Sequence, residues 1–402
     1  MGLQPLENKA LSRGTIRKAA CILTDITVRK SQLLVMMSTL FCLIMSASAE
    51  KKIKVTFINP GISDINNPTG EFWLSVSAFM QAAAENLNID LEVIYSERNH
   101  VLMQQQAMEV ASRTAHPDYL IVVNEKLAAG KMVEVADMAG IKTFMINNTF
   151  VGEQAQQYGA PREQYKHWLG SLTPDHRWAG YQIAKRIIDR ALQAGVKAKD
   201  GKLHVVAITG DRATHASVER VEGLHKALSE YPDVELKQLF YAEWNKDKAY
   251  EQTVSFLKRY PEIGAIWGAN DPMALGAMEG VVAAGKSPGK DVFIGGLNWD
   301  PSALDKVKDG TLVTTVGGHF MIGGWALVLL YDYEHGRDFA EAAVQLQPQF
   351  FGALHSDNID VFLNKLGDRN WRKIDFTKFS KVLNPTMKEY DFSLEAILQQ
   401  LP

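Results

Sequence analysis

The chain has 402 residues, of which 46% are hydrophobic and 22% are charged, and its formal net charge is −3 at pH 7. That length and apolar content suffice for two globular domains. A net acidic chain without a dense basic run argues against a protein that binds nucleic acid.

The beginning of the chain has the pattern of a secretory signal. Arg29-Lys30 precede an apolar segment, residues 33–45, and Ala47-Ser48-Ala49 then forms a small-x-small cleavage pattern. The apolar segment is shorter than the ~20 residues that a membrane-spanning helix needs. We therefore expect residues 1–49 to be a signal peptide, cut after Ala49 on export to the periplasm. An uncleaved membrane anchor is the alternative.

Removal of this leader changes the composition of the protein. Cys21 and Cys42 both precede the expected cut, so the mature chain has no thiol, which fits an oxidising compartment. The leader holds six basic and two acidic residues, so the net charge of the remainder is −7.

From residue 53 on, short β-rich runs alternate with longer helical runs. The first set predicts strands at residues 53–58, 91–95, 119–123 and 143–146, and helices at residues 72–87, 101–113 and 131–139. Residues 150–172 are polar and contain Gly152, Gly159 and Pro161, and we expect them to form a long excursion that interrupts the alternation. This alternation predicts a parallel, doubly wound sheet.

The same alternation then resumes. It predicts strands at residues 203–208, 234–241, 263–267, 292–294 and 312–316, and helices at residues 174–194, 217–229, 247–259, 272–284, 302–309 and 322–335. The tail from residue 346 has aromatic residues but no clear period. Two successive βαβ sets indicate two similar lobes.

One strand end stands out within the second set. The apolar strand at residues 263–267 is followed by Asn270-Asp271, Pro272 and a helical run of small residues. Asp271 has the position of an N-cap and Pro272 that of a first helical residue. Polar side chains at the carboxyl end of a strand lie where open α/β sheets bind ligands. An ordinary strand-to-helix connection is the alternative.

Several motifs in this order resemble a known family. They are INNP and FW after the first strand, ERVEGL at a helix start, AND-x-MALGA after a strand, GGLNWDPSALDKVKDG, and TTV. The chain resembles the type I periplasmic solute-binding proteins of the ribose/galactose group over roughly residues 53–333. There is a fainter resemblance to the periplasmic autoinducer-2 receptor. No helix-turn-helix precedes the first lobe, which excludes the related repressors.

The resemblance implies an α/β fold of two Rossmann-like lobes, each with a doubly wound parallel sheet. Three crossing segments would join the lobes as a hinge, and the lobes would close on a ligand between them. On this template the N-terminal lobe comprises residues 50–172 and 318–345. The C-terminal lobe comprises residues 173–317 and 346–402 with the tail.

Three aromatic residues are candidates for the walls of a sugar site, because sugar rings present flat C–H faces to aromatic rings. Phe72 and Trp73 begin the first helix, where the family has aromatic residues that stack on the sugar. We favour Trp73 in the pocket and its neighbour as the core anchor of the helix. Trp244 matches an aromatic residue of the second lobe that faces the sugar.

Polar candidates follow the strands of both lobes. Asn147 and Asn148 replace the Asp-Arg pair of ribose-binding relatives, so they keep hydroxyl recognition but lose charge-assisted hydrogen bonds. Asn148 could instead cap a turn. Arg220 matches a family arginine that reaches the ligand, and pairing along a solvated helix face is its alternative.

The remaining candidates lie near the end of the second set. Asn270 matches the ligand-binding asparagine of the family, and Asn298 stands where many relatives have a ligand-binding Asp. Asp300-Pro301 could be another helix start. Where the family has a final Gln or Arg, this chain has Gly317-Gly318 with His319 beside them. The glycines would leave space for a larger ligand or for His319, although a lone histidine is often structural.

No catalytic motif, phosphate-binding loop or metal-ligand pattern occurs in the mature sequence, so we expect no enzyme activity, no cofactor and no metal. The main hypothesis is a monomeric periplasmic protein that binds a sugar or sugar-like ligand and delivers it to the membrane permease of an ABC transporter. The alternative is a ligand-sensing subunit that acts on a membrane sensor kinase or cyclase.

Overall fold

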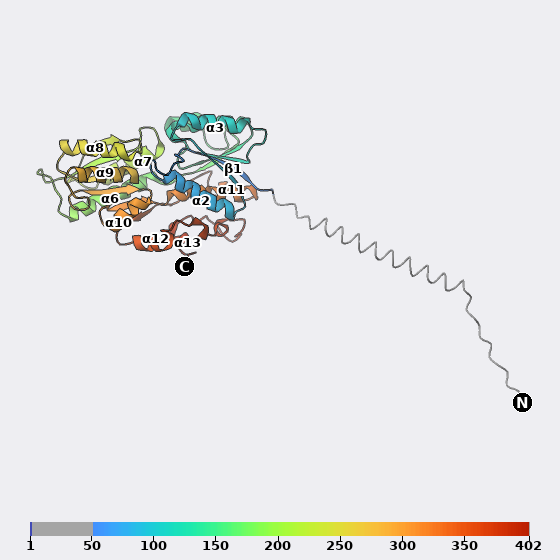
Figure 1. The fold of residues 1–402 in the computed structure, drawn as a ribbon. Coiled ribbons are helices and arrows are strands. Elements are labelled where there is room, and N and C mark those ends of the chain that lie inside the picture. Colours follow the sequence, from blue (N-terminus) through green and yellow to red (C-terminus); the bar gives the residue numbers. More distant parts are fainter. Residues whose placement is uncertain (2–50, 402) are drawn as a thin grey trace. The chain divides into compact units, whose positions relative to one another are not determined.

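The structure is a computed structural model that describes Met1 and residues 51–401. The predicted signal peptide, its cleavage site after Ala49 and both cysteines lie outside the described residues. Among the described helices, none combines the length and the apolar character needed to cross a membrane. Residues from Ile53 onward form one compact unit that contains two six-stranded sheets (Figure 1).

The first sheet has the strand order β11-β5-β4-β3-β1-β2, and all its neighbouring strands are parallel. Its strands are β1 (Lys54–Asn59), β2 (Asp90–Tyr95), β3 (Tyr119–Val122), β4 (Lys142–Ile146), β5 (Trp168–Leu172) and β11 (Gln345–Leu346). All four residues of β3 are buried, as expected of a strand that helices cover on both faces. We call this sheet and its helices the first lobe.

Helices cover both faces of the first sheet. They are α2 (Phe72–Asn86), α3 (His100–Ser112), α4 (Ala129–Met138), α5 (Gly152–Tyr158) and α11 (Ile322–Glu334). Helix α2 packs on α11 and α3 packs on α4. Figure 1 shows α3 on one side of β1 and the α2–α11 pair on the other. The lobe is therefore doubly wound, as the alternating pattern predicts.

The second sheet has the order β12-β10-β9-β8-β6-β7. Its strands are β6 (Leu203–Thr209), β7 (Val234–Tyr241), β8 (Ile263–Gly268), β9 (Phe293–Leu297), β10 (Thr314–Gly317) and β12 (Gly352–Leu354). The first five are parallel, and β12 joins β10 antiparallel at the edge. We call this sheet and its helices the second lobe.

Two helix pairs and a short helix complete the second lobe. They are α6 (His176–Gln193), α7 (His215–Leu228), α8 (Lys246–Arg259), α9 (Asp271–Ala283) and α10 (Pro301–Lys308). Helix α6 packs closely on α7, where Gly180 and Gly223 meet the backbone of the opposite helix. Helix α8 packs on α9 in the same manner at Gly276. Small residues thus allow these helices to approach each other closely.

The chain passes between the two lobes three times. The crossings follow β5, β10 and β11, at residues 173–175, residue 318 and residues 347–351. Two-lobed architecture with three crossing segments is the fold class expected from the sequence. The exact lobe boundaries expected from the sequence stay a prediction.

One expectation about the first lobe is wrong. Residues 150–172 do not interrupt the alternation, because they contain helix α5 and strand β5. Gly152 and Gly159 suggested an interruption, but they lie at the two ends of α5. Within β5, an added Cβ at Gly170 would lie 2.2 Å from the carbonyl oxygen of Val344. Close packing of the chain beside β11 therefore requires this glycine.

The tail after β12 packs on both lobes. Helix α12 (Ile359–Leu366) lies against α10, whereas the turns at Trp371–Lys373 and Phe376–Phe379 lie against α2. The last helix, α13 (Leu394–Leu398), ends the described chain. In the first lobe, Trp325 of α11 packs against the tail residues Phe379 and Phe392. The aromatic residues of the tail therefore belong to the hydrophobic core.

A buried carboxylate fixes the tail to α11. Asp332 accepts hydrogen bonds from the Ser380 hydroxyl, from the Lys381 backbone N–H at 2.6 Å, from the Val382 N–H at 3.3 Å and from the Tyr390 hydroxyl at 2.9 Å. Asp332 is fully buried. The carboxylate therefore satisfies several tail donors that are otherwise shielded from water.

We expect Asp332→Ala to lower the free energy of unfolding by about 3 kcal/mol or more, because it leaves several buried donors without an acceptor. Urea unfolding followed by circular dichroism measures this loss. Glu389→Ala, at an exposed position of the same tail, is the control and should stay within about 0.5 kcal/mol of the parent. An equally small change for Asp332→Ala would contradict the anchoring role.

Candidate functional site

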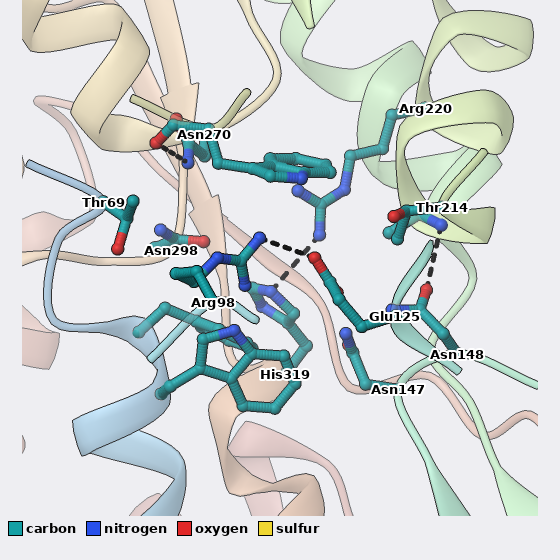
Figure 2. Close-up of a pocket in the computed structure, with 14 residues that line it drawn as sticks. Thr69, Arg98, Glu125, Asn147, Asn148, Thr214, Arg220, Asn270, Asn298 and His319 are labelled. Carbon is teal, nitrogen blue, oxygen red and sulfur yellow. Dashed lines mark hydrogen bonds and ion pairs between the residues drawn. The ribbon is translucent and has the colours of Figure 1, made fainter. Parts of the chain in front are cut away.

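A cavity lies between the lobes, at the carboxyl ends of strands from both sheets. It is lined by Thr69, Phe72, Trp73, Arg98, Glu125, Asn147, Asn148, Thr214, Ala216, Arg220, Trp244, Asn270, Asn298 and His319. All nine candidate residues of the sequence analysis are among these (Figure 2). The structure thus brings every candidate together, although their role in binding a ligand stays a prediction.

Three aromatic side chains form apolar surfaces of the cavity. Phe72 and Trp73 meet edge to face with ring centroids 4.9 Å apart, and both are almost buried. We expect only Trp73 in the pocket from the sequence, but Phe72 also lines it and stacks on His319 with ring centroids 4.3 Å apart. A cavity with aromatic faces and several polar groups suits a compact polar ligand.

Trp244 lines the cavity from the second lobe. Its backbone is left-handed, with φ of 61°, and its indole N–H donates to Asp211 at 3.0 Å. Gly210 lies flat against the ring, because an added Cβ would be 2.0 Å from the indole Cε2. Glycine at this strand end therefore allows the indole to lie in this position.

The two amides that follow β4 have different environments. Asn147 has φ of 64°, its carbonyl oxygen lies 3.0 Å from His176 Nε2, and its buried Oδ1 has no partner. Asn148 Oδ1 accepts from the backbone N–H of Ala216 at 2.9 Å, at the start of α7 in the other lobe. Asn147 thus keeps a free acceptor in the cavity wall, whereas the Asn148 oxygen joins the lobes.

Arg220 of α7 is buried and surrounded by neutral groups. Its Nη1 donates to the carbonyl oxygen of Ala269 at 2.8 Å, while Nη2 lies 3.4 Å from His176 Nδ1 and 3.3 Å from His319 Nε2. Its Nε has no partner. Burial lowers the pKa of Arg220 to about 9, against the opposing effect of Asp271 and Glu125. The guanidinium therefore remains mostly charged at pH 7.

The two histidines beside Arg220 are neutral. Burial and the charge of Arg220 hold the pKa of both His176 and His319 well below the usual range. Because His319 Nε2 accepts from Arg220, its proton resides on Nδ1, which is buried and without a partner. His319 therefore lines the cavity with a buried donor that has no partner in the protein.

The space beside His319 differs from the expectation. Gly317 and Gly318 do not leave room for a larger ligand, because the side chain of Trp299 fills the space next to Gly317. An added Cβ at Gly317 would lie 2.3 Å from Trp299 Cγ, and Gly318 has φ of 107°. The glycines accommodate the buried tryptophan and the turn before His319.

The N-cap of α9 is Asn270, and the prediction that Asp271 caps this helix is wrong. Asn270 Oδ1 accepts from the Met273 N–H at 2.9 Å, and its Nδ2 lies 3.4 Å from the carbonyl oxygen of Trp244. Asp271 is the first helical residue, and its carboxylate accepts from the Thr315 hydroxyl and from the Asp300 N–H. The sequence could not show that Thr315, on β10, competes for this carboxylate.

Asn298 and Asp300 follow β9. Asp300 precedes Pro301 at the start of α10, as expected, but its side chain makes no capping hydrogen bond. Burial raises the pKa of Asp300 to about 7, and the charge of Glu71 adds to this rise. The charge of Arg369 in the tail and a hydrogen bond from Asn298 oppose it. Burial and the nearby Asp300 also raise the pKa of Asp271. Two buried carboxyl groups thus lie behind the asparagines of the cavity.

Sequence reasoning missed five residues that line the cavity: Thr69, Arg98, Glu125, Thr214 and Ala216. Arg98 follows β2 and Glu125 follows β3, so the strand-end rule that found Asn147 could have found both. The Arg98 guanidinium lies 2.5 Å from the Glu125 carboxylate. Burial raises the pKa of Glu125, and Arg98 opposes this effect.

The lobes touch each other around the cavity. Lys126 and Glu243 form an ion pair at 2.9 Å, and the Lys246 N–H donates to the carbonyl oxygen of Pro68 at 2.9 Å. Gly70 in the first lobe packs on α9, because an added Cβ would be 2.5 Å from Pro272 Cγ. The structure therefore shows the two lobes closed over the cavity.

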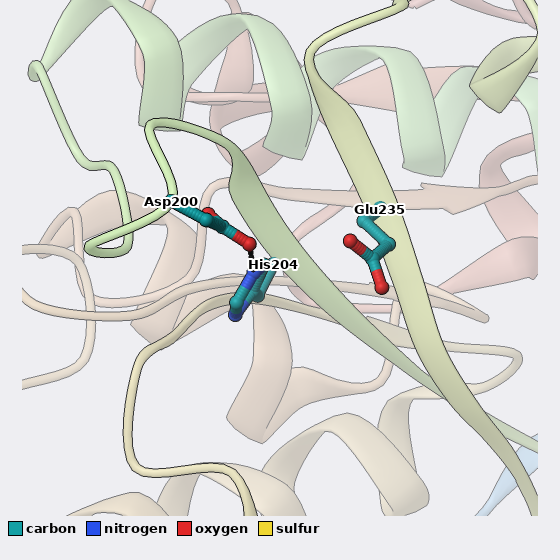
Figure 3. A group of neighbouring side chains, drawn as sticks. All are labelled: Asp200, His204 and Glu235. Atoms are coloured by element: carbon teal, nitrogen blue, oxygen red, sulfur yellow. Dashed lines mark hydrogen bonds and ion pairs between the residues drawn. The ribbon is translucent and has the colours of Figure 1, made fainter.

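A second group of ionisable side chains lies at the other end of the second sheet. Asp200, His204 and Glu235 offer ligand atoms within 4.8 Å of one another (Figure 3). His204 Nε2 contacts Asp200 at 2.8 Å, and Glu235 is bound by Lys237 at 2.7 Å. Since a lysine already compensates Glu235, this group is explained as a surface ion-pair network.

Fold and cavity together define a class of protein: a two-lobed binding protein that encloses a small ligand at a hinge. The model of the periplasmic binding protein domain matches residues 65–338. The chain belongs to this family, in its type I ribose/galactose group, and the family consists of solute-binding proteins that are not enzymes.

Several relatives support this assignment. The ribose import binding protein RbsB of Escherichia coli (strain K12) is 27% identical over 67% of this chain and 81% of the relative. The xylitol-binding protein of Mycolicibacterium smegmatis is 22% identical over 88% of this chain and 95% of the relative. The crystal structure of a periplasmic sugar-binding protein from Pseudomonas fluorescens has a TM-score of 0.76 and 37% identity, covering 86% of this chain and 99% of that chain.

We expect the Asp300 carboxyl to make stability depend on pH. Its pKa is about 7 in the folded protein and 3.8 ordinarily, so between these values the folded state binds more protons than the unfolded state. The stability contributed by this group is therefore full below about pH 4 and is lost as the pH rises through 7. Relative to Asp300→Asn, the parent should lose roughly 2–4 kcal/mol between pH 4.5 and 7.5.

Urea unfolding of both proteins at several pH values in this range measures that difference. Asp360→Asn, at an exposed position of α12, is the control and should give a curve parallel to that of the parent. Parallel curves for the parent and Asp300→Asn would refute the pKa assignment.

Proposed function

We propose that this chain is the periplasmic binding component of an ABC transporter and that it encloses a sugar or sugar-like polyol between its lobes. The observation that carries the proposal is the closed cavity, where aromatic faces of Phe72, Trp73 and Trp244 surround unpartnered polar atoms. Sugars combine apolar ring faces with hydroxyls that both donate and accept. The names of the relatives, which include ribose and xylitol, support the same class of ligand.

The partner and the compartment follow from this proposal. The mature chain would be released in the periplasm by cleavage after Ala49, bind its ligand as a monomer and present both closed lobes to a membrane permease. Deletion of the gene should then abolish uptake of the ligand. A lost signalling response with normal uptake would instead favour the sensor-subunit hypothesis.

Isothermal titration calorimetry of the mature protein against a panel of monosaccharides and polyols tests the proposal. A 1:1 complex with at least one carbohydrate is expected, with a negative heat-capacity change because apolar surface is buried. Binding of amino acids or nucleobases, with no carbohydrate bound, would refute it.

We expect Asn147→Gly to weaken binding of that carbohydrate about 10- to 100-fold, because the unpartnered amide oxygen of Asn147 is then lost to a ligand hydroxyl. Glycine adopts the left-handed backbone at φ of 64° without strain, so the backbone contact to His176 is kept. Calorimetry gives the change in Kd.

Asn88→Gly is a matched control, because Asn88 is exposed after α2 and has a similar φ of 54°. It should leave Kd unchanged. An unchanged Kd for Asn147→Gly as well would show that Asn147 does not contact the ligand.

A further inference from the structure

We propose that the ligand is a sugar acid, a polyhydroxylated molecule whose single carboxylate pairs with the guanidinium of Arg220. The inference rests on the proposed function, because it specifies which kind of sugar the same cavity takes. It follows from the charges and the unpartnered polar atoms of the cavity wall.

Three charged side chains line the cavity, and two of them neutralise each other. Arg98 and Glu125 form an ion pair at 2.5 Å, and both come from the first lobe. The third is Arg220, from the second lobe, which is only 3% exposed. The lining therefore carries one positive charge without a direct counter-charge.

The immediate partners of Arg220 are all neutral. Its hydrogen-bond partners are the carbonyl oxygen of Ala269 and the two uncharged imidazoles of His176 and His319. The ring of Trp244 lies 5.6 Å from the guanidinium carbon. Within the described part of the chain, no carboxylate forms an ion pair with Arg220. An unpaired charge at such a depth is unfavourable, and an ion pair with good geometry offsets that cost.

The nearby carboxylates have other partners. Asp271 accepts from the Thr315 hydroxyl and from the Asp300 N–H, and Asp211 accepts from Thr214, Ala213 and the indole of Trp244. The electrostatic fields of Asp271 and Asp211 reach the cavity, but their carboxylate oxygens hydrogen-bond to these other groups and not to Arg220. A ligand carboxylate is thus the group that can contact the guanidinium directly.

The unpartnered polar atoms of the cavity match both functional groups of a sugar acid, its carboxylate and its hydroxyls. Arg220 Nε and His319 Nδ1 are buried donors without acceptors, and Asn147 Oδ1 is a buried acceptor without a donor. A carboxylate accepts hydrogen bonds and cannot donate, so it suits the unpartnered Nε–H of the charged guanidinium. Asn147 needs a donor, which a ligand hydroxyl supplies. Figure 2 shows the guanidinium directed toward His319.

A phosphate ester fits the cavity less well than a carboxylate. A phosphate monoester carries about −1.5 to −2 charges at pH 7, which exceeds the single unpaired cation. A carboxylate carries one charge and matches it. Neutral sugars satisfy the hydrogen bonds but leave the guanidinium without a counter-charge.

The experiment compares each acid with its neutral counterpart on the mature protein. Calorimetry at pH 7.5 uses D-ribose with D-ribonate, D-glucose with D-gluconate and D-glucuronate, and D-galactose with D-galacturonate, together with D-ribose 5-phosphate. At least one acid should bind 10-fold or more tightly than its counterpart. Between pH 7.5 and 10, its affinity should fall about 10-fold as Arg220 loses its proton, while neutral sugars change much less.

The other outcomes are distinct. If a neutral sugar binds as tightly as its acid in every pair, the inference is wrong and the proposed function stands. Preference for the phosphate ester also overturns the inference. If no sugar, acid or ester binds, both the inference and the proposed function fail.

A variant of Arg220 tests whether the charge of this side chain, and not its shape, causes the preference for the acid. Arg220→Gln keeps a polar planar group without charge and should remove the preference for the acid, provided that its thermal melting shows a folded protein. Arg177→Gln, at an exposed position of α6, is the matched control and should keep that preference. Retained preference in folded Arg220→Gln would place the carboxylate elsewhere.

Discussion

The buried guanidinium of Arg220 is the interaction on which the closed arrangement of this molecule depends. It extends from α7 and contacts the end of β8 through Ala269, the start of α6 through His176, and the crossing after β10 through His319. His176 and His319 directly follow two of the segments that connect the lobes. One charged group therefore contacts the second lobe and two of its three connections to the first.

This arrangement links the hinge to the cavity wall. His176 contacts the carbonyl oxygen of Asn147, and His319 stacks on Phe72, so each histidine carries the contact onward to a cavity residue of the first lobe. A histidine in these places must stay uncharged, because a second positive charge beside Arg220 would be repelled. Burial enforces that neutrality by lowering the pKa of both rings.

The tail adds a second connection around the cavity. Arg369 contacts Glu71 at 3.3 Å and the hydroxyl of Ser75, at the start of α2, while its charge also acts on Asp300 of the second lobe. The first turn of α2 carries Phe72 and Trp73. The tail thus fixes the turn that carries the aromatic side chains of Phe72 and Trp73. Opening of the lobes would separate Asp300 from the loop at Gly70 that now covers it.

Local patterns predicted much of this structure from the sequence. The alternation of β-rich and helical runs gives the two doubly wound sheets because the periods of strands and helices differ. The family resemblance gave the aromatic candidates, Arg220 and His319, whereas the strand-end rule explains why the candidate asparagines lie at the cavity, because parallel strands bring their carboxyl ends to one edge. Both inferences depend only on neighbours along the chain or on topology.

The errors concern contacts between distant segments. Asn270 and Asp271 are equally good caps by residue type, and Thr315 on another strand decides between them by binding Asp271. The glycines at 317 and 318 suggested empty space, but Trp299 from a neighbouring strand end fills it. Residues 150–172 suggested an interruption of the alternation, but strand β5 in this segment pairs with β4 and with the distant β11.

The balance between such contacts also explains how the cavity can discriminate among ligands. The asparagines that line the cavity, Asn147, Asn270 and Asn298, carry no charge, so the charge of the lining comes from Arg98, Glu125 and Arg220. Arg98 and Glu125 belong to one lobe and can stay paired whether the lobes are open or closed. Arg220 belongs to the other lobe, so closure brings its charge against a ligand held by the first lobe. An anionic group on the ligand would then favour the closed state specifically, because its attraction to Arg220 develops as water leaves the cavity.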